Sequence, residues 1–205
     1  MTMSEICDLL ISGTISREMV DKILEEVQTD YYQPEKLLRL VIDSPGGSIP
    51  LALTLARFLM NCFNEIHTYS LSEVDSAAVC LYLCGNKRFA TPTSRFFMHP
   101  PGVHVQGMQT EQQLKELLQG LQTDTKCMVD FYCERTTISR SAWEEVFRNT
   151  RHLSVTEAQE VGIVTDVQSK ISHFLPHIIS LEDEVKFPKN TSSVSNDEIR
   201  NRKKN

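Results

Sequence analysis

Long apolar stretches alternate with short polar breaks along the first half of the chain. The run from Leu37 to Ile42 carries a single charge, which is typical of a buried strand. The stretch from Pro50 to Phe63 is almost continuously apolar and poor in β-branched residues, which favours a buried helix. Between them, residues 43–48 read Asp-Ser-Pro-Gly-Gly-Ser. This segment predicts a tight strand-to-helix turn, with Ser48 as the N-cap and Pro50 in the first helical turn.

The rest of the first hundred residues repeats this alternation of strand and helix. The pattern predicts a strand at residues 9–11, a helix from Arg17 to about Gln28 with Ser16 as its N-cap, a strand at 66–71, a polar connection at 72–75 and a short apolar helix at 76–83. Strands separated by helices in this order indicate βαβ units. We therefore expect an α/β fold with a mainly parallel sheet and helices packed on it.

The second half of the chain predicts a long helix and a polar tail. The expected elements are strands at 88–90 and 95–99, a helix from Thr110 to about Glu134, short helices at 141–147 and after the capping box Ser154–Glu157, and a last strand at 163–164. The long helix is expected to project and contact another subunit, with burial in its own domain as the alternative. Residues 1–180 are expected to form the domain, and the polar residues 181–205 a disordered tail.

Composition and charge narrow the function classes. The 205 residues carry a net charge of −6 and only one basic block, Arg200 to Lys204, which argues against a nucleic-acid partner. The longest apolar run, 50–63, is too short to span a bilayer. The six cysteines include no C-x-x-C pair, so buried free thiols in a reducing compartment are expected. The first residues show no signal-peptide pattern, so we expect a cytoplasmic location, and nothing indicates a metal or a cofactor.

Two residues, Ser76 and His99, are candidates for chemistry. A serine at the start of a helix is most often an N-cap, and a histidine at a strand end is often an ordinary structural residue. Ser76, however, is expected at the polar mouth of a buried helix. There a neighbouring base can activate its hydroxyl, and the amide of Ala77 can face an oxyanion. The two glycines of the 43–48 turn fit either a tight connection or a backbone anion site. Taken singly, these features are weak evidence for catalysis.

The order and context of these motifs resemble the proteolytic subunit of the Clp protease, a branch of the crotonase-type fold. The similarity extends from about Leu10 to Val167. The matching segments are Ile42-Asp-Ser-Pro-Gly-Gly-Ser48, Asp75-Ser-Ala77 before an apolar helix, Leu83-Cys-Gly-Asn-Lys-Arg-Phe-Ala-Thr-Pro-Thr-Ser-Arg95, Met98-His-Pro-Pro-Gly102, and Leu153-Ser154 with the following Glu157-Ala158, Val161-Gly162, Val164 and Asp166. The resemblance implies a ClpP-like fold of stacked βαβ units with a projecting helical handle.

The resemblance also implies roles for five residues. Ser76 would be the nucleophile and His99 the general base, with the amides of Gly47 and Ala77 forming the oxyanion hole. The family's triad ends in an aspartate, and its position here corresponds to Thr150. A threonine accepts a hydrogen bond from imidazole but carries no charge to stabilise imidazolium. A weak enzyme is therefore expected, which Thr150→Asp would strengthen by at most about 10⁴ in kcat.

Three departures from the family bear on this expectation. Without a carboxylate at Thr150, either Asn149, Asp166 or a water would have to orient the imidazole. Asp75 precedes the nucleophile where the family has a small apolar residue, and it either turns away or opposes a nearby oxyanion. The first predicted strand begins at Leu9, which leaves little room for the axial loops that dock the family's AAA+ ATPase. That partner is therefore called into question.

Two functions follow as expectations from the resemblance. The first is a serine endopeptidase of reduced activity that assembles into a homo-oligomeric ring and cuts peptides or unfolded proteins. The second is a catalytically impaired structural ring subunit beside an active paralogue. Acyl-CoA chemistry on the related crotonase fold is a third and more distant alternative, against which the Ser76–His99 pair argues.

Overall fold

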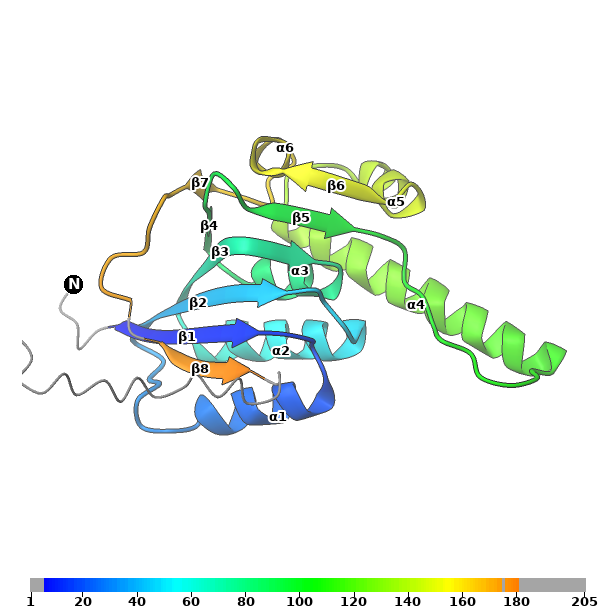
Figure 1. Ribbon diagram of the computed structural model, residues 1–205, viewed down its shortest axis with the longest axis horizontal. Coiled ribbons are helices and arrows are strands. Elements are labelled where there is room, and N and C mark those ends of the chain that lie inside the picture. Colours follow the sequence, from blue (N-terminus) through cyan, green and yellow to red (C-terminus); the bar gives the residue numbers. More distant parts are fainter. Residues whose placement is uncertain (1–5, 175, 181–205) are drawn as a thin grey trace, which may run out of the picture.

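Parallel strands joined by helices make up the first half of the structure (Figure 1). The structure is a computed structural model, and it describes residues 6–174 and 176–180. In chain order, the elements are β1 (Ile6–Ser12), α1 (Arg17–Glu26), β2 (Leu37–Ser44), α2 (Ile49–Cys62), β3 (Glu65–Asp75), α3 (Ala77–Tyr82), β4 (Lys87–Ala90), β5 (Arg95–Met98), α4 (Glu111–Arg135), α5 (Arg140–Arg148), β6 (Arg151–Ser154), α6 (Val155–Glu160), β7 (Asp166–Val167) and β8 (His177–Ser180).

The strands form one sheet in the order β6-β5-β3-β2-β1-β8, and off this path β4 pairs with β3 and β7 pairs with β4. Every pairing among them is parallel except that between β5 and β6. β4 pairs with the first half of β3 and β5 with its last three residues, so these two strands follow one another along β3. The predicted α/β fold with a mainly parallel sheet is confirmed.

Two apolar layers lie on the two faces of the sheet. Leu38 and Leu40 of β2 face the main core, which also contains the buried side chains of α1, α2 and α3. Val41 of the same strand faces the other side, where it packs with Tyr69 and Phe89. β2 is therefore buried on both faces, which explains the nearly continuous apolar run that predicted it.

Local capping signals placed several helix starts correctly. The Ser16 hydroxyl accepts a hydrogen bond from Met19 N (3.2 Å) at the start of α1. Ser154 and Glu157 form the predicted capping box of α6. Ser48 does occupy the N-cap position of α2, but its side chain makes no capping hydrogen bond. The start of α2 is instead defined by Pro50 in the first turn.

Two predicted segments near strand ends were wrong. Residues 72–75 are not a polar connection but the last third of β3, because Glu73 pairs with Arg95 and Asp75 with Phe97 on β5. Residues 163–164 are not a strand, because their amides bond to the carbonyl of Ala158 in the turn after α6. The strand lies just beyond, at β7, and β8 follows it on the edge beside β1.

The helix α4 extends away from the sheet, as predicted (Figure 1). Its buried residues all lie in its last third: Met128, Val129, Phe131 and Tyr132. Toward its N-terminal end, Leu114 and Leu118 are 53% and 56% exposed. These leucines lie four residues apart and therefore share one face of the helix.

The six cysteines are free thiols. Cys7, Cys80 and Cys84 are buried, and burial raises the pKa of each to about 12. These three thiols therefore stay protonated and pack as small apolar groups. Within residues 6–174 and 176–180, no helix is both long and apolar enough to cross a membrane. The predicted tail, residues 181–205, lies outside the described residues.

Candidate active site

Ser76 joins β3 to α3 in a backbone conformation that a serine rarely adopts. Its φ is 55° and its ψ is −124°, in the positive-φ region where a side chain costs energy. Its hydroxyl makes no capping hydrogen bond to α3. Ser76 is therefore not acting as a side-chain cap, which was the ordinary structural interpretation of this residue. A strained serine between a strand and a helix is the geometry of a nucleophile elbow.

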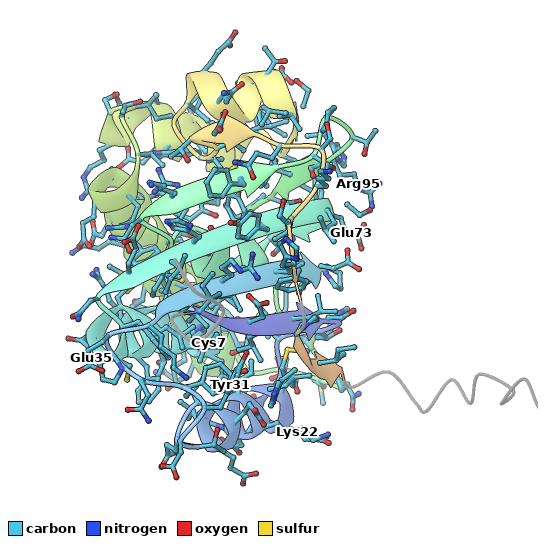
Figure 2. The ribbon with its side chains drawn as sticks, turned by 90° about the vertical axis from the view of Figure 1, so that its left-hand side faces the viewer. Cys7, Lys22, Tyr31, Glu35, Glu73 and Arg95 are labelled. Atoms are coloured by element: carbon cyan, nitrogen blue, oxygen red, sulfur yellow. The ribbon has the colours of Figure 1, made fainter. Side chains whose placement is uncertain are left out.

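The backbone of β5 braces Ser76 through Phe97. The Ser76 N–H donates to Phe97 O (2.6 Å), and the Phe97 N–H donates to Asp75 Oδ1 (2.9 Å). Burial raises the pKa of the Asp75 carboxyl above its ordinary value, and Glu73 raises it further, while Arg95 opposes both. Arg95 forms an ion pair with Glu73, next to it in Figure 2, and its Nη2 lies 3.9 Å from Asp75 Oδ2. The Asp75 side chain is thus turned toward β5.

The Gly-Gly turn before α2 lies directly against this serine. Gly46 has a φ of 94°, and a Cβ placed on it would be 2.7 Å from Asp75 O, 2.8 Å from Ser76 Cβ and 3.0 Å from Ala77 N. Real Cβ atoms essentially never approach other atoms this closely, so only glycine fits here. Gly47 faces away from Ser76. A Cβ placed on Gly47 would clash with backbone atoms of Ile15 in the β1–α1 connection.

The backbone amides of the Gly-Gly turn and of the first residue of α3 differ in whether they have an acceptor. The Gly46 N–H donates to Ser44 Oγ (3.1 Å), and the Ser48 N–H donates to a backbone carbonyl of the β1–α1 connection (2.9 Å). The N–H groups of Gly47 and Ala77 have no acceptor among the residues that the structure describes. These are the two amides predicted for an oxyanion hole, which needs backbone N–H groups that are available to a substrate oxygen.

His99 directly follows β5, and its ring has two supports. Its Nδ1 lies 2.8 Å from the carbonyl oxygen of Pro100. The ring stacks on Phe97, with centroids 5.2 Å apart, and Phe97 also stacks with His152 at 4.2 Å. Among the described residues, no hydrogen bond joins the Ser76 hydroxyl to His99, and catalytic bonds of this kind often tighten only when substrate binds. Both residues nevertheless connect to Phe97, one through the backbone and the other through the ring.

The third predicted position, Thr150, lies directly before β6. β5 and β6 are antiparallel, with Met98 opposite Arg151. His99 follows Met98 and Thr150 precedes Arg151, so both residues lie just beyond this pair of strands. Thr150 is exposed and has a positive φ of 41°. Among the described residues, no hydrogen bond links Thr150 to the imidazole of His99, and its role stays a prediction.

The other two candidates for orienting the imidazole lie elsewhere. The Asn149 amide donates to the carbonyl oxygen of Glu145 (3.2 Å) and also to its carboxylate. Asp166 is paired through β4 with Tyr69 of β3, six residues before Asp75. That separation corresponds to about 20 Å along the strand. Asp166 is therefore at the wrong end of the sheet to contact His99.

A cavity of about 610 Å³ lies between α4 and α5, beside this group of residues. Pro100 contributes to its wall, so the cavity begins one residue after His99. Val129 and Phe147 give it an apolar part. Its charged residues are mainly basic, with Glu144 as the acidic one beside Lys126, Arg140 and Arg148. A space of this size accommodates an amino-acid side chain with room to spare.

Three residues of this arrangement were not identified from the sequence: Gly46, Phe97 and Pro100. Signals for two of them were present. Phe97 and His99 are two residues apart on a predicted strand, so their side chains share a face. Gly46 belongs to the recognised Gly-Gly pair, but only the structure shows which glycine contacts the serine. The direction of the Pro100 carbonyl left no signal in the sequence.

The fold and the site together define a class of protein. A strained serine at a strand-to-helix turn, free amides beside it and a histidine after the neighbouring strand are the arrangement that serine hydrolases use. Here it is carried by a mainly parallel α/β sheet. The family model described as Clp protease matches residues 2–170 of this chain. The chain therefore belongs to the Clp protease family, and the resemblance drawn from its motifs is confirmed.

A curated relative supports this assignment. The chain is similar to the ATP-dependent Clp protease proteolytic subunit 4, chloroplastic, of Arabidopsis thaliana, with 28% identity over 203 residues. The alignment includes 94% of this chain and 65% of the relative, so the chain spans less than two thirds of the relative's length.

Proposed function

We propose that this protein is a ClpP-like serine endopeptidase with Ser76 as nucleophile and His99 as general base. The observation that carries the proposal is the strained backbone of Ser76, whose hydroxyl is not used to cap α3. Strain of about 1–3 kcal/mol persists only where the surroundings impose it, and such residues cluster at active sites. Gly46 and Phe97 impose it here, by close packing and by a backbone hydrogen bond.

The proposed reaction proceeds in two stages. Ser76 Oγ attacks the peptide carbonyl carbon while His99 Nε2 takes the hydroxyl proton, and the carbonyl oxygen becomes an oxyanion stabilised by the amides of Gly47 and Ala77. When this intermediate collapses, the C–N bond breaks and His99 returns the proton to the leaving amine. A water molecule, deprotonated by His99, then hydrolyses the acyl ester and regenerates the hydroxyl of Ser76.

The activity is expected to be low, because no carboxylate stands at the third position. Thr150 lacks the charge that would stabilise the imidazolium formed in the first step. Peptides or unfolded proteins as substrates, a homo-oligomeric ring and a cytoplasmic location belong to this proposal. The exposed leucine face of α4 supports the ring.

A fluorophosphonate probe tests the proposal, because it reacts only with an activated serine. We expect labelling of the wild type, none of Ser76→Ala, and normal labelling of Ser72→Ala, which changes an exposed serine on the same strand. Peptide cleavage should disappear in parallel with labelling. Cleavage that survives in Ser76→Ala would rule out the catalytic role of Ser76.

A second candidate function is a structural ring subunit without catalysis. The residue type at position 150 favours it, because the resemblance to the family implies an aspartate where this chain has Thr150. In that case the wild type would resist the probe yet still assemble. Labelling and sedimentation measured on the same preparation separate the two functions.

A further inference from the structure

We infer that the carbonyl of Pro100 and the ring of Phe97 position His99 in place of the missing carboxylate. This inference rests on the proposed function, since it concerns the same base. It starts from two contacts, the 2.8 Å approach of His99 Nδ1 to Pro100 O and the 5.2 Å stacking of the His99 and Phe97 rings.

The carbonyl contact selects the tautomer of the imidazole. A carbonyl oxygen can only accept a hydrogen bond, so Nδ1 must carry the hydrogen. In the neutral ring, Nε2 then keeps a lone pair. That nitrogen is the one able to take the proton of a serine hydroxyl. Selecting this tautomer is one of the two tasks that a triad carboxylate performs.

The backbone after His99 is stiff enough to keep this carbonyl in place. The ring of Pro100 fixes its own φ. Because Pro101 follows, Pro100 is confined to extended conformations, which limits the direction of its carbonyl. The Pro100-Pro101 pair therefore makes the backbone that follows His99 rigid.

Phe97 adds the second support, and it links the base to the nucleophile. Its carbonyl accepts from Ser76 N and its amide donates to Asp75 Oδ1, so its backbone is fixed on both sides of the residue. Its ring stacks with His99 and with His152 of β6. A shift of the imidazole would therefore have to disturb an aromatic contact built on the same residue that holds the serine.

The carbonyl does not perform the second task of a carboxylate. It carries a partial charge only, so its hydrogen bond to an imidazolium is weaker than a charge-assisted one. This predicts a base that is correctly oriented but poorly stabilised once protonated. An aspartate at the exposed Thr150 would face solvent screening and would compete with a contact that is already made. The gain from Thr150→Asp should therefore be less than about tenfold, far below the 10⁴ of a full triad.

The decisive experiment observes the tautomer directly. Long-range proton–nitrogen spectra of histidine-labelled protein, recorded near pH 8.5 where an ordinary imidazole is neutral, distinguish the two tautomers. The signal of His99 is assigned by its loss in His99→Gln. We expect Nδ1–H in the wild type and a mixture of tautomers in Pro101→Gly, which frees the Pro100 carbonyl. Gly102→Ala is the matched control, because a Cβ at Gly102 meets nothing within 4 Å.

The kinetic arm uses the same variants. Pro101→Gly should lose about tenfold or more in kcat, as part of the 10²–10⁴ that a general base contributes, while Gly102→Ala keeps the wild-type value. An Nε2–H tautomer in the wild type, or a gain of tenfold or more from Thr150→Asp, would overturn the inference. If Ser76→Ala leaves cleavage unchanged, the proposed function fails instead, and the tautomer measurement still decides how His99 is held.

Discussion

Gly46→Ala is the sharpest perturbation of the contact between the Gly-Gly turn and Ser76. The added Cβ would lie 2.7 Å from Asp75 O, 2.8 Å from Ser76 Cβ and 3.0 Å from Ala77 N. Two of these atoms are backbone, so the clash cannot be relieved by turning a flexible side chain. The alanine would also have to adopt a φ of 94°.

The expected cost combines two terms. A positive φ costs a residue with a Cβ about 1–2 kcal/mol. Overpacking a tight site costs about 1–3 kcal/mol more. Gly46→Ala should therefore lower the free energy of unfolding by about 2–5 kcal/mol, a large part of the stability of an ordinary domain. Any relief of the clash moves Ser76 and Ala77, so labelling by a fluorophosphonate should fall as well.

Urea unfolding and probe labelling measure the two effects separately. Gly120→Ala in α4 is the control, because a Cβ there meets nothing within 4 Å and alanine favours a helix by about 1 kcal/mol. Adding Ser76→Gly to Gly46→Ala removes one of the three clashes and should recover part of the stability, with a coupling of about 0.5–3 kcal/mol. If Gly46→Ala unfolds at the wild-type urea concentration and is labelled at the wild-type rate, the packing argument is wrong.

Three further predictions concern other parts of the molecule. The fold raises the pKa of the Asp75 carboxyl, so the contribution of Asp75 to folding stability should fall as the pH rises past the ordinary carboxyl pKa. Asp75→Asn should therefore raise the free energy of unfolding at pH 7 but not at acid pH, as measured by urea titrations. Arg39 of β2 forms a buried ion pair with Asp8 of β1 (Nε–Oδ1 2.6 Å) and also donates to the carbonyls of Ser172 and His173. Arg39→Met removes all of these contacts and should lower the free energy of unfolding by about 3–5 kcal/mol in the same assay, whereas a loss under 1 kcal/mol would refute this. Leu118→Ser should lower the sedimentation coefficient without changing the circular dichroism spectrum, whereas the control Gln119→Ser should leave the sedimentation coefficient unchanged. Equal sedimentation coefficients for Leu118→Ser and the wild type would count against α4 as an assembly surface.

Elements with local signals could be predicted from the sequence. Ser16 and the Ser154–Glu157 box fixed two helix starts because a cap involves neighbours within one turn. The end of β3 could not be predicted, because the polar residues 72–75 are extended only through pairing with β5. The edge strand β8 was missed for the same reason, since its partner β1 lies at the other end of the chain.

The candidate site likewise has parts that could be predicted from the sequence and parts that could not. Ser76, His99 and the Gly-Gly turn could be proposed from the sequence because they stand in motifs that resemble those of the Clp protease family. The orientation of each group could not, since it depends on contacts between strands. The fate of Asp75 illustrates this: the sequence left two alternatives open, and the hydrogen bond from Phe97 N shows that the side chain is turned toward β5.

The loss of a triad carboxylate has a different meaning once its two tasks are separated. A carboxylate sets the tautomer of the histidine and also stabilises its protonated form. In the proposed mechanism, Pro100 takes over the first task through a neutral carbonyl, and nothing at Thr150 takes over the second. The first task decides whether a base exists at all, and the second decides how fast it works. A chain that keeps the first and lacks the second should therefore be a slow peptidase rather than an inert subunit, and its rate should depend more on Pro101 than on Thr150.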